Sequence, residues 1–450
     1  MRSYQVAGET ITALVAATVA GLALALPIDF GWTSRSAALQ LDLLAYSLPR
    51  AVSAGALIAM IAAVLITTLG SPTAAWATAL CGLLALLANH VFGHATTANS
   101  SLSTLNFIDS LAGGIVLGAL GAAVLHRRLP AFAWTLGILL SLLLGSVNPV
   151  PRVGGGIDTT SGDHWHPTDL PPLWMIVLSV ILTGFGFLTN RKRPTAQRLS
   201  ADLPLAPILA GVVLVLVTLA SAEWLARHGD SKAGISLAVV TAVGTAIIAA
   251  MLLPGRDGEI VLLAVGLGAV GAATIAAEMP AWSIPVLALA SALGMWAGSR
   301  RGAPIAALVA GIVLGVFTAC TSDSNGAWLV VGSAAVESWI LGYALLSTRP
   351  RYVPSRVLGT MVLFVPSAVL GMRDYVARGN YADAMESTDH ALTCSVDSGG
   401  ASAPGWTSVM VAGGCLAGIY LLRRSRKPVP ATIDETPDSP ESWNGTVTSD

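Results

Sequence analysis

Long apolar stretches recur along the whole chain, separated by shorter segments that contain Pro, Gly, Asp or Arg. Crossing a hydrocarbon layer of about 30 Å requires roughly 20 mainly apolar residues in a helix. The strict alternation of polar and apolar residues that marks membrane β-barrels is not seen in these stretches. Because helices then remain the structure that satisfies the backbone in lipid, the pattern predicts an all-α, polytopic integral membrane protein.

The apolar stretches predict about 14 transmembrane helices, which together form a transmembrane helical domain over residues 1–427. The predicted spans are 7–26, 51–69, 73–93, 108–125, 131–148, 172–189, 205–226, 234–253, 259–278, 281–299, 303–320, 327–346, 355–373 and 406–422. After Lys427 the chain turns to Pro, Asp, Glu, Ser and Thr without apolar periodicity. Such a segment cannot bury enough apolar surface to fold, so residues 428–450 are expected to be a disordered cytoplasmic tail.

The positions of Lys and Arg predict the orientation of these spans. If the N-terminus is cytoplasmic, 17 of the 24 Lys and Arg residues fall in cytoplasmic segments, where cationic loops are retained. The prediction is therefore that both termini are cytoplasmic. As an alternative, the first span could be a signal peptide cleaved near Ala25, although Glu9 within its apolar run speaks against this.

The composition narrows the possible partners. Hydrophobic residues make up 54% of the chain and charged residues 11%, against about 25% charged residues in a typical soluble domain. The formal net charge is -1, so we expect membrane lipid as a partner and no binding of nucleic acid. Because Arg strongly outnumbers Lys in an Ala-rich chain, we expect a bacterial protein of the inner (plasma) membrane.

Motifs for nucleotide hydrolysis and metal binding are missing from the sequence. There is no Gly-x4-Gly-Lys-Ser/Thr loop, so any transport must draw on an ion gradient or on a partner. The only dense group of His and Asp surrounds His164 and His166 in a predicted outer loop, and we interpret it as a solvated loop. No cofactor and no metal are therefore expected.

Glu337 is the most informative single residue, because it lies at the centre of the predicted span 327–346 without a cationic residue nearby in sequence. A carboxylate at the middle of a bilayer is costly, so it is expected to face the bundle interior or an aqueous cavity. It is our candidate for proton coupling. The alternative is a protonated side chain that joins two helices by a hydrogen bond.

Further polar residues lie near the predicted outer surface, at comparable depths. These pathway candidates are Asn89, His90, Asp109, Glu223 and Glu278. They could line the mouth of a pathway, but residues this close to the interface can also reach water directly.

Two of the four cysteines face the outer side in this topology. Cys320 ends a predicted span and Cys394 lies in the last outer loop, so both would be in an oxidising compartment where disulfides persist. They are candidates for a disulfide, with two free thiols as the alternative. Cys81 and Cys415 lie within spans and are expected to be packing residues.

A cytoplasmic segment carries glycines and arginines in a suggestive order: Gly294, Gly298, Arg300, Arg301 and Gly302. This order resembles the degenerate form of the Gly-x-x-x-Asp-Arg-x-Gly-Arg signature of the major facilitator superfamily, with Gly298 near the place of the acidic residue. Its fourteen-helix branch also shares the predicted number of spans. The loop after the second span, at Gly70, lacks the charged motif.

The resemblance implies two six-helix halves, at residues 1–199 and 255–427, joined by linker helices within 200–254. It further implies that the five residues of the motif take part in the transition between inward-facing and outward-facing states. The function implied is a secondary transporter or exporter of a small molecule or an envelope component, driven by an ion gradient, rather than an enzyme. Transport would proceed by alternating access around a midplane site, with Glu337 as the proton-coupling group.

A second function remains open, because the outer segments 27–50, 149–171 and 374–405 are long. Long outer loops resemble those of membrane-embedded glycosyltransferases, polymerases and lipid translocases of cell-envelope biogenesis, which handle lipid-linked substrates. Asp29 and Asp42 in the first outer segment could then serve as catalytic base or metal ligand.

The predicted topology can be tested by labelling single-cysteine variants with a thiol reagent that does not cross membranes. We expect cysteines in segments 190–204 and 347–354 to react only from the cytoplasmic side, and those in segment 374–405 only from outside. Opposite accessibility of any one segment would contradict the topology.

Overall fold

The computed structural model describes residues 2–26, 38–96, 102–147, 171–191, 205–228, 231–274, 279–322, 327–348, 350, 352–373 and 402–426. Within these ranges all regular structure is helical, which confirms the predicted all-α class. The helices are α1 (Arg2–Ala25), α2 (Ala38–Leu69), α3 (Pro72–Thr96), α4 (Leu102–Val124), α5 (Arg128–Val147), α6 (Leu173–Asn190), α7 (Leu205–His228), α8 (Lys232–Leu252), α9 (Glu259–Thr274), α10 (Ser283–Arg300), α11 (Pro304–Cys320), α12 (Ala327–Ser347), α13 (Val353–Met361) and α15 (Ala403–Ser425).

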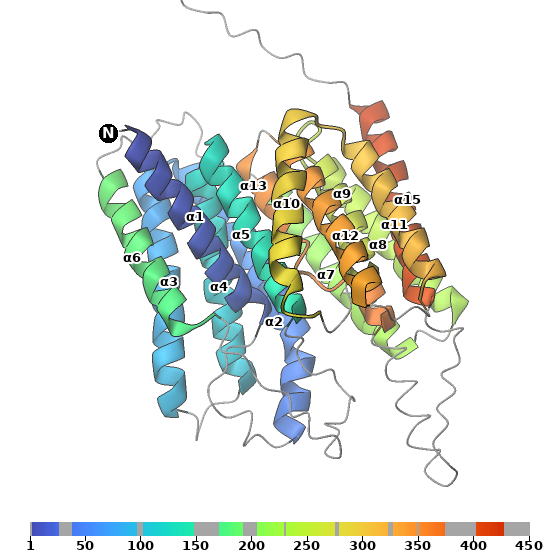
Figure 1. The fold of residues 1–450 in the computed structure, drawn as a ribbon, viewed down its shortest axis with the longest axis horizontal. Coiled ribbons are helices and arrows are strands. Elements are labelled where there is room, and N and C mark those ends of the chain that lie inside the picture. Colours follow the sequence, from blue (N-terminus) through green and yellow to red (C-terminus); the bar gives the residue numbers. More distant parts are fainter. Residues whose placement is uncertain are drawn as a thin grey trace, which may run out of the picture.

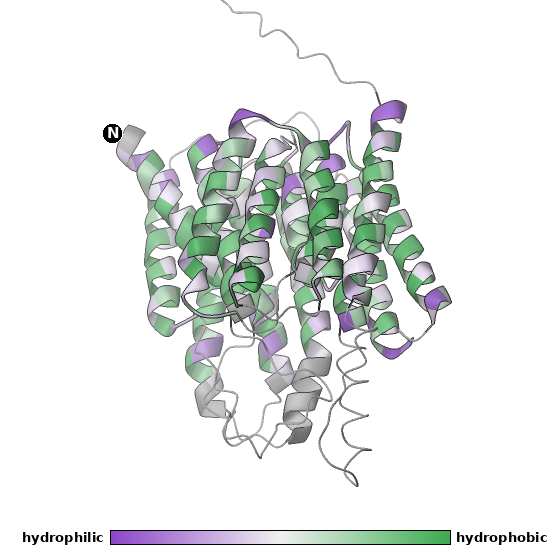
Figure 2. Cartoon of the chain, turned by 45° about the vertical axis from the view of Figure 1, so that its right-hand side comes forward, coloured by the Kyte–Doolittle hydropathy of each residue, from purple (hydrophilic) through white to green (hydrophobic). Residues whose placement is uncertain are grey.

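The length and surface of these helices fit a membrane environment. Ten of the described helices are long and apolar enough to cross a bilayer, and α9 and α11 are shorter apolar helices. Large apolar side chains such as Phe185, Val240 and Val313 are exposed on the outside of the bundle. Figure 2 shows hydrophobic residues along the middle of the helices and hydrophilic residues towards their ends. The chain is therefore a multi-pass membrane protein.

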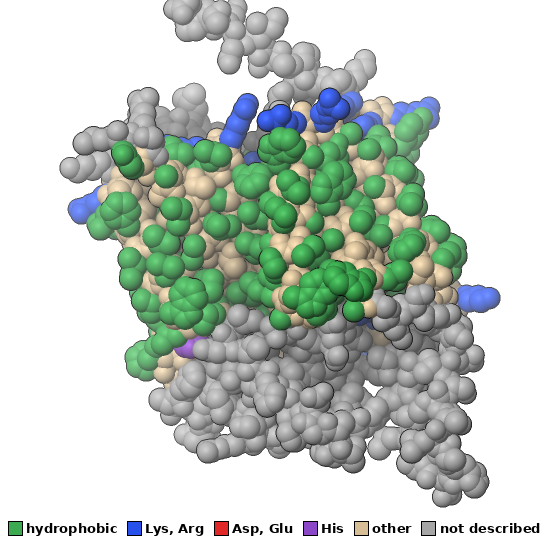
Figure 3. Space-filling model, in the orientation of Figure 1, with side chains coloured by type: hydrophobic (Ala, Val, Ile, Leu, Met, Phe, Trp, Pro, Cys, Tyr) green, Lys and Arg blue, Asp and Glu red, His purple; other side chains and the backbone are tan. Residues whose placement is uncertain are grey.

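Charge is distributed unevenly between the two ends of the bundle. The start of α1 and the end of α15 lie at the same end (Figure 1). Lys and Arg side chains gather along this end in the view of Figure 3. The asymmetry has the form that the positive-inside rule requires of a cytoplasmic surface. Fourteen crossings with both termini inside remain a prediction.

Two predicted spans differ from the helices observed. The helix α2 begins at Ala38, so residues 38–50 of the segment expected as an outer loop are helical, with Pro49 inside the helix. The span expected over 355–373 is interrupted: α13 ends at Met361, a turn at 362–364 and a bend at 365 follow, and residues 368–373 are helical again.

Pro366 explains the interruption, because proline has no N–H and its ring clashes with the carbonyl four residues earlier. In the turn, the N–H groups of Phe364 and Val365 donate to the carbonyls of Met361 and Val362, three residues back, at 3.1 and 3.2 Å. The Ser367 hydroxyl then accepts from the Leu370 N–H at 3.2 Å and caps the second piece. Hydropathy alone did not reveal this break.

Six helices at the beginning of the chain and six at its end pack in the same order. In the first group, α1 packs on α4, α5 and α6, α2 packs on α4, and α3 packs on α4 and α6. In the last group, α9 packs on α12, α13 and α15, α10 packs on α12, and α11 packs on α12 and α15. Each of these pairs in one group therefore has a counterpart in the other, with α1 to α6 matching α9 to α13 and then α15; the contact between α9 and α11 has no comparable counterpart among the described helices of the first group.

Contacts between the two groups are also symmetric: when each helix is replaced by its counterpart in the other group, a contacting pair becomes another contacting pair. The pair α2 and α13 corresponds to the pair α10 and α5, and the pair α4 and α13 corresponds to α12 and α5; all four are in contact. The remaining helices, α7 and α8, pack on each other, with α7 also on α2 and α8 also on α9 and α15. This arrangement approximates a two-fold axis between the groups.

The tightest helix pairs depend on glycine. A Cβ atom at Gly114 or Gly118 of α4 would lie 2.2 or 2.0 Å from the carbonyl oxygens of Gly55 and Ala59 in α2. The matching pair in the last group is equally close, since a Cβ at Gly294 of α10 would lie 2.1 Å from the Trp339 carbonyl oxygen in α12. Such backbone contact is possible only with small residues at the interface.

Replacement of Gly118 by Ala tests this dependence. The added methyl group would force α2 and α4 apart, and we expect a loss of about 1–3 kcal/mol of stability, as for overpacked cores. The control is Gly184→Ala in α6, where the added Cβ would meet nothing within 4 Å, so we expect a melting temperature equal to or above that of the parent. Equal melting temperatures of the two purified variants in detergent would contradict the packing argument.

Candidate functional site

A cavity of about 410 Å³ lies between the two groups of helices. The first group contributes α5 and the end of α1, whereas the last group contributes α9, α10, α12, α15 and the break after α13. Most of its wall is apolar, and its polar side chains are few: Ser141, Thr218, Ser291, Glu337, Ser338, Ser367 and Arg373. Both the volume and the sparse polar groups are typical of a small-molecule site.

Glu337 is the carboxylate of this cavity. It lies in the middle of α12 and is 1% exposed. Neither carboxylate oxygen has a hydrogen-bond partner among the described residues. A Cβ atom at Gly271 of α9 would lie 3.5 Å from Glu337 Oε1, so the carboxylate faces α9 at Gly271. The side chain is thus directed into the bundle and not to lipid, and no Arg or Lys in the described part of the chain neutralises it.

The break after α13 forms part of the cavity wall, from Val362 to Ala368. Irregular backbone at membrane depth is tolerated where it lines a cavity rather than lipid. Discontinuous helices of this kind build substrate sites in many transporter folds. Beyond the break, Arg373 Nη1 donates to the Ala272 carbonyl at 2.6 Å and so ties residues 368–373 to the last turn of α9.

The predicted pathway residues do not form one ring. Asn89 Nδ2 donates to Asp109 Oδ1 at 2.6 Å and to the Leu105 carbonyl at 3.1 Å, which joins α3 to α4 within the first group. His90, the next residue of α3, is also buried. None of these three side chains lines the central cavity.

Glu223 lies elsewhere, at the end of α7. Its carboxylate accepts from Arg50 Nε and Nη2 of α2 at 2.9 and 3.1 Å, in an ion pair that is largely exposed. Glu278 is outside the described residues. A role of these residues in a pathway remains a prediction.

The glycines of the motif, in α10 and just after it, face α12. Cβ atoms at Gly298 and Gly302 would lie 2.3 and 2.6 Å from the carbonyl oxygens of Tyr343 and Ser347. The Tyr343 hydroxyl donates to the Arg301 carbonyl at 2.6 Å, and the Arg300 guanidinium lies 4.4 Å from the centre of the Trp296 ring. These contacts give the motif a packing role, and its role in a conformational transition stays a prediction.

Several other predictions fall outside what the structure describes. Cys320 is exposed at the end of α11, but Cys394 is outside the described residues, so their pairing is untested. The same holds for Asp29 and for the side chain of Asp42, on which the glycosyltransferase interpretation depends, and for the His164 segment.

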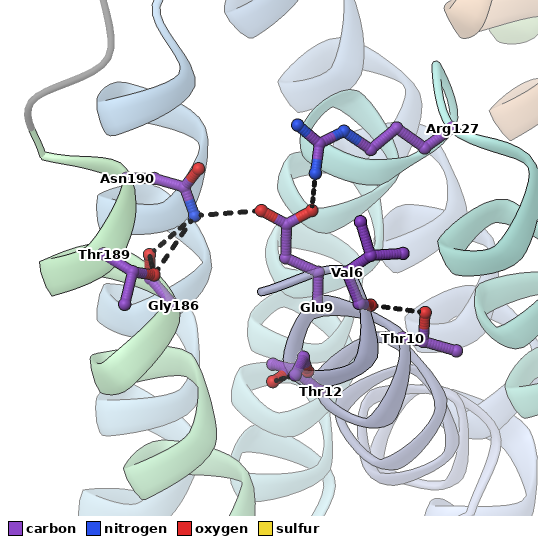
Figure 4. A network of polar contacts seen from close by, with 9 residues as sticks. Val6, Glu9, Thr10, Thr12, Arg127, Gly186, Thr189 and Asn190 are labelled. Carbon is purple, nitrogen blue, oxygen red and sulfur yellow. Dashed lines mark hydrogen bonds and ion pairs between the residues drawn. The ribbon is translucent and has the colours of Figure 1, made fainter. Parts of the chain in front are cut away.

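Sequence inspection missed a polar network near the start of α1, shown in Figure 4. Glu9 is 6% exposed and accepts a hydrogen bond from Arg127 Nη1, in the turn between α4 and α5. Asn190 Nδ2 at the end of α6 lies 3.4 Å from the other Glu9 oxygen. The network joins α1 to α6 and to the α4–α5 turn at one end of the first group.

The last group has a matching ion pair. Glu259, in the first turn of α9, accepts from Arg423 Nε and Nη2 of α15 at 2.9 and 2.7 Å. Since α9 corresponds to α1 and α15 to α6, both groups use a buried carboxylate to join their first and last helices. Aligning the order of the spans in the two halves could have revealed this correspondence from sequence.

Comparison with known proteins gives similarity of shape only. No model of a protein family and no curated protein matches the chain. A variant of the E. coli fucose:proton symporter FucP aligns with a TM-score of 0.46 and 14% identity, over 94% of this chain and 98% of that chain. An auto-inhibited POT family peptide transporter gives 0.49 and 12%, over 95% and 97%. The major facilitator superfamily transporter FucP in its outward conformation gives 0.46 and 15%, over 94% and 99%. At these scores the likenesses do not by themselves assign a family or an activity.

The Glu259 and Glu223 ion pairs provide a matched test of burial. Replacement of Glu259 by Gln leaves Arg423 without its counter-charge, and we expect a loss of about 2–3 kcal/mol, below the limit for a fully buried pair because Arg423 is 31% exposed. Replacement of Glu223 by Gln should cost about 0–1 kcal/mol, since both partners of that pair reach solvent. The measurement is chemical unfolding of each purified variant. Equal losses of stability in the two variants would contradict the view that the Glu259 pair contributes more because it is buried.

Proposed function

We propose that this protein is a secondary transporter of the major facilitator type. In this proposal residues 1–199 and 255–427 are the two halves, and the segment 200–254, with α7 and α8, supplies two linker helices. The observation that carries the proposal is Glu337, a carboxylate without a hydrogen-bond partner among the described residues, in a cavity between two helix groups of similar packing. Alternating access would arise when the groups rock about the approximate two-fold axis.

The repeated packing supports rocking rather than deformation of the groups. Each group contains a pair of helices in backbone contact, α2 with α4 and α10 with α12. Each also has its first and last helices joined by a buried polar contact of a glutamate. Between the groups lies the cavity, so the groups are not packed together over this region. The boundary between the groups is therefore the natural place for movement.

The position of the cavity indicates which side is open in this conformation. With the N-terminus inside, the cavity is lined by the outer parts of α5 and α9, at residues 139–145 and 264–272. At the cytoplasmic end the groups touch, since Arg356 Nη1 of α13 donates to the Leu125 carbonyl, after α4, at 3.2 Å. We infer an outward-facing state that is closed towards the cytoplasm.

In this mechanism Glu337 carries the coupling proton. A carboxylate that has no counter-charge is costly in an apolar cavity, so binding of a proton or of a cationic group relieves it. When the cavity opens to the other side, access to water changes and the proton can leave. Transport of a substrate through the same cavity would then be coupled to the proton gradient.

Replacement of Glu337 by Gln tests this role. Gln keeps the volume and hydrogen-bonding capacity of the side chain but cannot bind or release a proton. We expect uptake driven by a pH gradient to fall to the level of empty vesicles, while membrane insertion and melting temperature stay near those of the parent. Glu337→Asp should retain part of the uptake.

The assay uses vesicles with the purified protein, a pH gradient, and fucose and a dipeptide as first probes, because both are small enough for a cavity of about 410 Å³. The control is Asp109→Asn, which removes another buried carboxylate. Because Asp109 does not line the cavity, we expect uptake to be retained, in contrast to the pathway role predicted for Asp109 from sequence. Full uptake by the Glu337→Gln variant would overturn the coupling role. A parent protein that moves neither these probes nor a wider panel of small solutes would overturn the transport proposal.

A further inference from the structure

A second cavity, of about 310 Å³, lies at the end of the bundle that carries the N-terminus. Its first wall is the α4–α5 turn with the start of α5, including Arg128 and Phe132. Its second wall comes from the last helix group, with Ser299 of α10, Leu346 of α12 and Arg356 of α13. Like the central cavity, it therefore lies where the two groups meet, but it is nearer the end of the bundle that carries the N-terminus.

The charge of this cavity is strongly one-sided. Four basic side chains line it, namely His126, Arg127, Arg128 and Arg356, and its described lining contains no Asp or Glu. Arg127 is already neutralised by Glu9. Neither Arg128 nor Arg356 contacts a carboxylate in the described part of the chain, so two permanent positive charges face the cavity without a counter-ion.

The missing counter-charge matters most for Arg356, which is only partly accessible. Among the described residues its guanidinium makes a single hydrogen bond, from Nη1 to the Leu125 carbonyl at 3.2 Å. A guanidinium carries five N–H donors and stays protonated in proteins. Withdrawing such a charge from water without an anion is unfavourable. In addition, α5 begins at Arg128, so the positive end of a 20-residue helix points to the same place.

We propose that this cavity binds a phosphate group, supplied by the head group of an anionic lipid, between Arg128 and Arg356. An arginine guanidinium can bind phosphate through two parallel N–H···O bonds, provided that two of its N–H groups are not already bonded. Basic pockets between transmembrane helices on the cytoplasmic side bind lipid head groups. Phe132 and Leu346 beside the arginines provide apolar contact for the lipid portion next to the phosphate.

The bound phosphate would act as a bridge. Arg128 belongs to the first helix group and Arg356 to the last, so an anion held by both links the groups at this end. The site does not depend on the proposed transport activity, because binding can be measured without any substrate of the central cavity.

The test is direct binding to the full-length protein after its lipids have been exchanged for a neutral detergent. The probes are phosphatidylglycerol, phosphatidylcholine as a lipid without net charge, and inorganic phosphate. We expect phosphatidylglycerol to bind the parent protein more tightly than phosphatidylcholine. Arg356→Gln and Arg128→Gln should each weaken it about tenfold, the effect of one lost charge-assisted hydrogen bond.

The control is Arg424→Gln, an exposed arginine at the same end of the bundle that does not line the cavity, and its affinity should equal that of the parent. Arg128 is itself exposed, so its variant tests the site even if Arg356→Gln does not fold. If inorganic phosphate does not displace phosphatidylglycerol, the phosphate group that the site binds is that of the lipid. If inorganic phosphate displaces the lipid, the site binds free phosphate instead. Equal affinity of all three variants and the parent, or equal binding of the two lipids, would overturn the proposal.

Discussion

Backbone contact between helices is the constraint on which this membrane fold depends. Within a bilayer, lipid tails are as apolar as leucine, so burial of apolar side chains gives little drive for helices to associate. Close approach then has to come from small residues, and Gly114, Gly118, Gly294 and Gly298 provide it in two corresponding helix pairs, α2 with α4 and α10 with α12. Each pair is held at carbonyl contact; α1 and α3 pack on α4, and α9 and α11 pack on α12 in the same way.

The hydrogen-bond partners of the buried carboxylates distinguish structural residues from the candidate functional residue. Glu9 and Glu259 are buried but bonded, and each joins the first and last helices of its group. Asp109 is buried and accepts from Asn89. Glu337 differs from these because both of its oxygens lack a partner in the described structure and face a cavity. The absence of a partner, more than burial itself, distinguishes the candidate site.

Sequence could predict the helices and Glu337 because both are local signals. A run of apolar residues marks a span wherever it folds, and a single carboxylate inside such a run stands out by its cost. The Glu9 network could not be read in this way, since Arg127 and Asn190 lie 118 and 181 residues further along the chain. The break at Pro366 was missed because hydropathy counts side chains and takes no account of the missing backbone N–H.

The pair of helices α7 and α8 gives the molecule two unequal sides. The two groups meet along two seams, one at α2 and α13 and the other at α5 and α10. The helix α7 packs on α2 and also touches α13, whereas α8 packs on α9 and α15, so this pair lies over the first seam. The seam at α5 and α10 has no such cover among the described helices. Among the described helices, a compound that enters the protein sideways from the lipid, rather than from water, would therefore meet the least cover between α5 and α10.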